Sequence, residues 1–179
     1  TSQNLIKKGV VIDRLLDSLI VTDGIKSGDL FLGDKNAVMI ASRILAYGPE
    51  YEVELTNPET EQKFQHNFDL SAIDYKILPK DIDYSKNEFK IKLPASKDKL
   101  VFKLLTGSDE SDIEADLKSI AKLGLGQGKE ITTRLKHVII SVNDEIDRGV
   151  INNYVDNMLS RDSLALRKEI ARITPDINL

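Results

Sequence analysis

The chain has 179 residues, of which 41% are hydrophobic and 30% charged, and its formal net charge is −4 at pH 7. This composition is typical of a globular protein that can bury a core, and it excludes an intrinsically disordered chain. The sequence contains no cysteine, which excludes disulfides, thiolate metal sites and a cysteine nucleophile. The negative net charge argues against a dedicated nucleic-acid-binding protein.

Residues 1–48 are predicted to form a helical segment. Apolar residues recur at helical spacing in its first half and predict an amphipathic helix, along the stripe Ile12, Leu15, Leu16, Leu19 and Ile20. A helical turn over 3–8 precedes it. A second helix should begin at Asp34, a suitable N-cap, and end at Tyr47 before Gly48-Pro49. We expect its buried side to consist of Ala37, Val38, Ile40, Ala41, Ile44 and Leu45.

The hydrophobic period changes in residues 49–106, which predict a small antiparallel unit of β-hairpins. Alternation over 51–55 and 64–70 predicts two half-buried strands, joined by a turn at Asn57-Pro58-Glu59-Thr60. Two further runs, 89–93 and 100–105, predict a second hairpin with its turn at 94–98. Residues 73–78 form either another strand or an extended connection. The hairpins must be antiparallel because short turns join only antiparallel neighbours.

Residues 107–179 are predicted to be mainly helical. A helix capped by Ser108 or Asp109 should end at the glycines 124, 126 and 128. The segment 131–142 is ambiguous, and its many β-branched residues favour a strand. Helices follow over 150–159 and from a cap at Ser160 or Asp162 to a point before Pro175. The expected fold class is therefore α+β.

The patterns that could carry chemistry each have a simpler structural interpretation. The three glycines match neither a dinucleotide-binding fingerprint nor a P-loop, and the acidic run 109–116 lacks the spacing of a calcium loop. His66 and His137 are the only imidazoles, whereas a zinc site needs three or four good ligands. We therefore predict no catalytic, cofactor-binding or metal-binding residues and no enzymatic activity, with a hydrolase as a remote alternative.

The distribution of basic residues and the length of the apolar runs indicate whether nucleic acid or a membrane is a partner. The basic residues Arg161, Arg167, Lys168 and Arg172 favour a solvated helical face over a phosphate-binding surface, so no nucleic-acid partner is expected. The apolar runs are far shorter than the ~18 residues of a membrane span, so we expect no membrane insertion. The chain begins with Thr1 and ends just past a helical pattern, and we expect the functional unit to extend beyond both ends.

Several short blocks in a fixed order carry a family resemblance. They include Leu5-Ile-Lys-Lys-Gly9, Arg43 with Tyr47-Gly48-Pro49-Glu50-Tyr51, Leu104-Leu-Thr-Gly107 and Val155-Asp-Asn-Met-Leu159. This succession resembles a family of baseplate hub and hub-assembly proteins of T-even-type contractile-tailed bacteriophages, over nearly the whole chain. The resemblance implies a structural component of the tail baseplate, in the hub region, that acts through protein–protein contacts without catalysis.

The same resemblance implies where the protein works and with what. Its place would be the virion tail baseplate, assembled in the host cytoplasm, and its partners other baseplate or tail proteins, with a homo-oligomer also possible. The alternative is an assembly chaperone for the hub that is not part of the virion. These two roles differ in whether the contacts are permanent or transient, and large apolar contacts would favour the permanent one.

The candidate interface residues are Arg43, Tyr47, Tyr51, Asn57 and Pro58. Tyr47 is an aromatic residue directly before a helix end, a position suited to an interface anchor. Relatives often carry a C-x-x-C zinc knuckle at the tip of the following hairpin. This sequence has Asn57 and Thr60 there, which cannot replace thiolates, so no cofactor or metal is expected at the tip.

Overall fold

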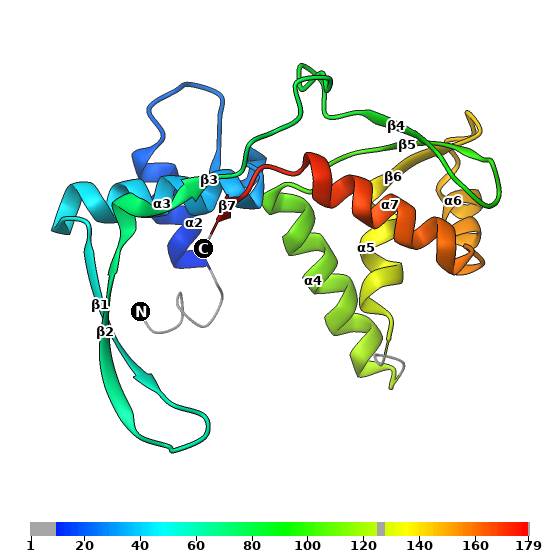
Figure 1. Ribbon diagram of the computed structural model, residues 1–179. Helices are drawn as coiled ribbons and strands as arrows, with labels where there is room; N and C mark the ends of the chain where they lie inside the picture. Colours follow the sequence, from blue (N-terminus) through cyan, green and yellow to red (C-terminus); the bar gives the residue numbers. More distant parts are fainter. Residues whose placement is uncertain (1–9, 125–127, 179) are drawn as a thin grey trace.

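The computed structural model describes residues 10–124 and 128–178 (Figure 1). Its architecture is mixed α+β, as predicted from the sequence. The elements in chain order are α2 (Val10–Leu19), η1 (Ser27–Asp29), α3 (Leu32–Tyr47), β1 (Glu50–Thr56), β2 (Lys63–Asp69), η2 (Leu70–Ala72), β3 (Asp74–Tyr75), β4 (Phe89–Lys92), β5 (Lys99–Phe102), α4 (Gly107–Lys122), α5 (Glu130–Val138), β6 (Ile139–Val142), α6 (Arg148–Asp156), α7 (Ser160–Ile173) and β7 (Ile177–Asn178). The predicted helical turn over 3–8 and the middle of the glycine segment, 125–127, lie outside the described residues.

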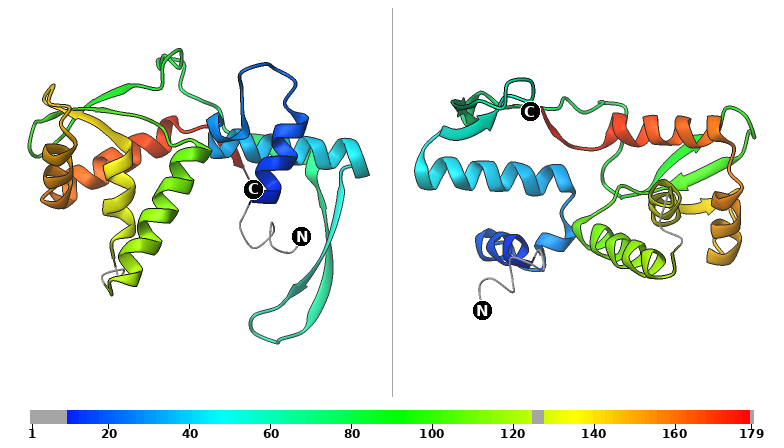
Figure 2. Two further views of the ribbon diagram at one scale, coloured as in Figure 1. Left: turned by 180° about the vertical axis from the view of Figure 1, so that it is seen from behind. Right: turned by 90° about the horizontal axis from the view of Figure 1, so that it is seen from below.

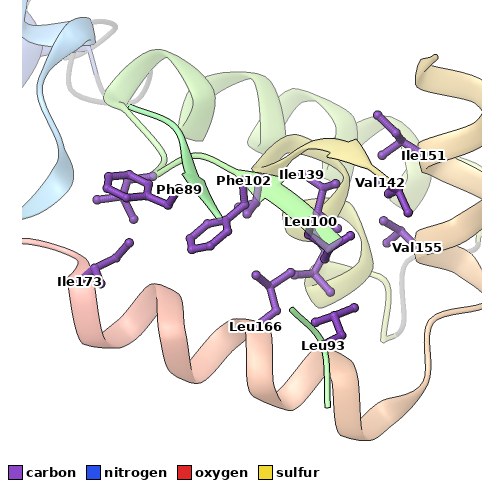
Figure 3. Packing of buried hydrophobic residues seen from close by; sticks show 13 residues of the cluster. Phe89, Leu93, Leu100, Phe102, Ile139, Val142, Ile151, Val155, Leu166 and Ile173 are labelled. Atoms are coloured by element: carbon purple, nitrogen blue, oxygen red, sulfur yellow. The ribbon is translucent and has the colours of Figure 1, made fainter. Parts of the chain in front are cut away.

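The main hydrophobic core lies in the C-terminal part of the chain, around the antiparallel sheet β4-β5-β6 (Figure 3). Phe102 and Ile139 of the sheet are fully buried. They belong to one hydrophobic cluster with Leu166 and Ile173 of α7. The rings of Phe89 and Phe102 lie 5.7 Å apart. Leu166 and Ile173 are two helical turns apart in sequence, so α7 presents one apolar stripe to the sheet.

The prediction of a strand over 131–142 is wrong for most of that segment. Residues up to Val138 form α5, and only Ile139–Val142 form a strand, β6, which pairs with β5. Leu135 and Val138 are buried at helical spacing, so packing of this face overrides the weak β-propensity of the neighbouring threonines. The third strand of the core sheet therefore comes from a segment far from the two hairpins in sequence.

The N-terminal helices α2 and α3 enclose little apolar surface. Leu16 is fully buried, but Ile12, Leu15 and Leu19 of the predicted stripe are exposed. The helices are held together by an ion pair between Lys35 Nζ and Asp13 Oδ1 at 2.5 Å. The expected buried side of α3 is also largely uncovered, since Ala41 is exposed, Leu45 is 88% exposed and the other four residues are only half-buried.

The C-terminal end of the described chain packs between α3 and the main core (Figure 2). Strand β7 pairs antiparallel with β3, in the register Tyr75 with Ile177. The chain before β7 passes so close to α3 that a Cβ on Gly33 would lie 2.1 Å from the carbonyl oxygen of Pro175. The amide of Gly107, at the start of α4, donates to the carbonyl of Leu30 at 3.0 Å. Both contacts fix α3, and the hairpin that follows it, relative to the core.

Two predicted helix starts are corrected by the structure. Helix α3 begins two residues before Asp34, and its N-cap is Phe31 without a side-chain bond. Helix α4 begins at a cap formed by Thr106, which shares a capping box with Asp109. Asp109 is thus the N3 residue of the motif, and its acidic neighbours lie in a solvated first turn as expected.

The start of α7 is also different from the prediction. Its N-cap is Leu159, and neither Ser160 nor Asp162 caps it. Asp162 is buried, and its carboxylate accepts from the amides of Ala95 at 2.7 Å and Ser96 at 2.9 Å. This carboxylate therefore joins the turn between β4 and β5 to α7. Burial raises its pKa, but the hydrogen bonds from the two amides and from the Ser96 hydroxyl outweigh burial and lower it.

Candidate functional site

The hairpin β1–β2 forms a two-stranded sheet of its own and projects from the end of α3 (Figure 1). The predicted strands and their antiparallel pairing are confirmed, but the expectation that they are half-buried is wrong. Every residue of β2 is exposed, and Val53 alone is partly covered in β1. Isolated two-stranded hairpins are marginally stable in water, so this segment is unusual in leaving both of its faces open.

One face of the hairpin is apolar along its whole length. The register places Tyr51 opposite Phe68, Val53 opposite His66 and Leu55 opposite Phe64. Since side chains alternate between the faces of a strand, all of these point to one side. We call this surface the hairpin face, and it consists of Tyr51, Val53, Leu55, Phe64, His66 and Phe68. The rings of His66 and Phe68 meet edge to face at 4.4 Å.

The base of the hairpin face is organised by Arg43 on α3. Its guanidinium lies 4.8 Å from the ring centre of Tyr47 and 5.8 Å from that of Tyr51. It also donates to the carbonyls of Gly48 at 3.1 Å and Glu50 at 3.3 Å, so it fixes the path from helix to strand. Gly48 itself has a φ of 84°, a conformation that favours glycine at this sharp exit. Tyr47 and Tyr51 remain 79% and 45% exposed.

Asn57 and Pro58 lie at the other end of the hairpin and shape its turn. The Asn57 side-chain oxygen accepts from the amides of Glu59 at 2.8 Å and Thr60 at 3.3 Å, which is the Asx-turn expected from this residue. The Asn57 amide donates to the carbonyl of Gln62, and the turn closes with Glu61 at a φ of 56°. Asn57 therefore acts on the hairpin's own backbone, while Pro58 is exposed at the tip.

The structure brings together Arg43, Tyr47 and Tyr51 from the predicted interface and separates them from Asn57 and Pro58. Five residues of extended strand lie between Tyr51 and Asn57, so these two residues are about 20 Å apart at 3.3 Å per residue. Phe64 and Phe68 are not among the predicted interface residues, because the alternation of apolar residues in their strand is also the pattern of a face in contact with a core. Alternation alone cannot tell a face that is covered by the same chain from one that is open.

The hairpin also concentrates negative charge. Residues 50–69 contain six carboxylates and one lysine, a net charge of −5, whereas the whole chain has −4. The lysine, Lys63, pairs with Glu54 across the strands at 2.6 Å. Hydrogen bonds from the hydroxyl and the amide of Ser71 lower the pKa of Asp69, so this carboxylate stays ionised at the base of the hairpin.

A second open apolar surface lies on the other side of the hairpin base. It is a groove between α3 and the segment after β2, continuing to β7, and its lining includes Ile40, Ile44, Leu70, Ile73 and Ile177. This is the side of α3 that the sequence pattern predicts to be buried. The N-terminal part of the chain therefore offers apolar surface in two adjacent places.

The two histidines do not form a catalytic arrangement. His66 lies on the hairpin face, and His137 on α5 contacts Asp116 on α4 with its Nε2 at 2.9 Å from the carboxylate. The side chain of Asp116 is 59% exposed. Ser119 lines the same depression, but its hydroxyl donates to the carbonyl of Ala115 on its own helix. This pair links two helices at the surface and gives no support to the hydrolase alternative.

Within 10–124 and 128–178, no group of three or more histidine, aspartate or glutamate side chains is arranged to hold a metal ion. No helix in the part of the chain that the structure describes is long and apolar enough to cross a bilayer. The open apolar hairpin is the most distinctive surface of the molecule.

An exposed aromatic ribbon on a folded scaffold is typical of proteins that work by contact with other proteins. The comparison with known families agrees with this class. The sequence matches the family described as T4 bacteriophage base plate protein over residues 2–173, and the chain therefore belongs to that family. The baseplate part of the resemblance is thus confirmed. No curated protein and no solved structure matches the chain.

Proposed function

We propose that this protein is a structural component of the hub region of a phage tail baseplate, held there by permanent contacts with other tail proteins. Membership of the baseplate protein family supports the general role. The observation that carries the finer proposal is the hairpin face, which leaves Tyr51, Phe64 and Phe68 each more than 40% exposed. Aromatic residues of this kind dominate the energetics of stable interfaces when a partner covers them.

The size of the open surface supports a lasting contact. Together, Tyr47, Tyr51, Phe64 and Phe68 expose about 400 Å², with ~200 Å² for one fully exposed ring. A standard interface buries about 800 Å² on each partner, so these four rings supply about half of one. The adjacent groove on α3 adds further apolar area to the same end of the molecule.

The experiment that tests this role is quantification of the polypeptide in finished particles. Phage particles would be purified on a density gradient, washed at high salt, and digested with isotope-labelled reference peptides from this chain and from the tail tube protein. We expect a fixed ratio of the two proteins in every preparation. If the polypeptide occurs in assembly intermediates but is missing from purified particles, the protein is a non-virion assembly chaperone instead.

A further inference from the structure

The charge of the hairpin indicates what kind of surface covers its apolar face. Of the chain's formal charge of −4, residues 50–69 account for −5, so the remainder of the chain has a net charge of +1. Apart from Glu54, which pairs with Lys63, these acids have no lysine or arginine partner within the hairpin. Glu50 lies directly opposite Asp69 in the register, and like charges in this position destabilise a strand pair.

Charge gives no support to pairing of the hairpin faces of two copies of the chain. Two hairpins packed face to face would lie about 10 Å apart, the usual distance between stacked sheets. Salt screens charges over about 8 Å at physiological ionic strength, so the repulsion between two such ribbons is weak, but no attraction between opposite charges would favour their pairing. The remainder of the chain has a net charge of +1 only, but it includes a depression on β4 and β5 that is lined by Lys90, Lys92 and Lys99, so a second copy is the alternative occupant that the crosslinking below must distinguish.

We infer that the hairpin face docks on a different baseplate protein, at an apolar strip bordered by an excess of lysine and arginine. This inference rests on the proposed function and adds the chemical character of the partner's surface. The apolar residues supply the contact area, and the carboxylates of Glu50, Glu52 and Glu54 face the opposite side of the same thin ribbon. Charge of complementary sign on the partner would speed encounter and select it against acidic surfaces.

Site-specific photo-crosslinking tests this inference in the full-length protein. The photoreactive residue p-benzoylphenylalanine replaces Phe64 on the hairpin face or, as the matched control, Gln65, the next residue on the opposite face of the same exposed strand. Infected cells and purified particles are irradiated separately, and the linked peptides are identified by mass spectrometry. We expect position 64 to link to another tail protein, within a segment that has more lysine and arginine than acidic residues, and position 65 to link much less.

A charge variant tests the electrostatic part. Glu50→Lys with Glu52→Lys changes the hairpin charge from −5 to −1 and leaves the apolar face intact. The change also removes the like-charge pair with Asp69, so folding should not suffer, which circular dichroism would verify. We expect the yield of crosslinks from position 64 to fall about tenfold, the size typical of lost steering.

Several results would overturn the inference: links between two copies of this chain, links to an acidic segment, equal yields at positions 64 and 65, or an unchanged yield in the charge variant. A failure of the proposed function looks different. In that case position 64 still links to a basic segment of a tail protein in infected cells, but the polypeptide is missing from the purified particles.

Discussion

Replacement of Tyr47 by alanine separates what this residue contributes to folding from what it contributes to association. Its side chain is 79% exposed, so folding removes only about 40 Å² of a ~200 Å² ring from water. At ~25 cal/mol per Å² the truncation costs about 1 kcal/mol of unfolding free energy, and the lost contact with Arg43 adds roughly 0.5–1 kcal/mol for an exposed cation–π pair.

The loss on association should be larger. The remaining ~160 Å² of Tyr47 corresponds to about 4 kcal/mol if a partner buries all of it, and truncation of a central aromatic residue typically costs at least ~2 kcal/mol of binding free energy. We therefore expect the affinity for the baseplate to fall at least about 30-fold. The stability is measured by urea unfolding, and the association by the occupancy of the variant in purified particles in competition with the wild-type protein.

Leu123→Ala provides the control for Tyr47→Ala. Leu123 is 74% exposed at the end of α4, away from the hairpin, and its truncation should change neither quantity by more than about 0.5 kcal/mol. If Tyr47→Ala lowers stability and occupancy by equal free energies, or if Leu123→Ala lowers occupancy as much, Tyr47 is not an interface anchor.

Three further substitutions test the fold that supports the hairpin. Leu16→Asp places a charge at a fully buried position and should cost about 3–5 kcal/mol of unfolding free energy; unchanged thermal melting would remove Leu16 from the core. Gly33→Ala drives a Cβ into the Pro175 carbonyl and should release β7, which faster hydrogen exchange at the Lys76 amide would reveal, because that amide donates to Asp176. The lowered pKa of Asp162 means that its carboxylate stabilises the fold above the ordinary value of 3.8 and that this contribution disappears as pH falls through the folded pKa; Asp162→Asn should cost about 1–3 kcal/mol at pH 7, with a difference from wild type that shrinks in acid, and a pH-independent difference would contradict this role.

Local patterns in the sequence were sufficient for the hairpins and for the helices other than α5, but not for their environment. The strands of the hairpin and the Asx-turn at Asn57 follow from alternation and turn chemistry, and the structure has both. Burial was predicted less well, because an apolar stripe shows which residues share a face without showing what covers it. For this reason the stripe of α2 and the hairpin face were both expected to be more deeply buried than they are.

Contacts between distant segments were beyond prediction from one sequence. Strand β6 and the pairing of β3 with β7 depend on packing between residues about 40 to 100 positions apart. The capping role of Thr106 was missed because Ser108 and Asp109 are equally good capping types. In the candidate site, the clustering of Arg43, Tyr47 and Tyr51 follows from their closeness in sequence, whereas the contribution of Phe64 and Phe68 requires the strand register.

A cryo-electron microscopy map of the intact tail, at a resolution that shows side chains, tests the role of the hairpin most directly. We predict that the protein occupies the baseplate with its hairpin face against a different tail protein, and that the rings of Tyr51, Phe64 and Phe68 are covered there. A map in which the hairpin extends into solvent, or in which two copies of this chain pack hairpin against hairpin, would contradict this prediction.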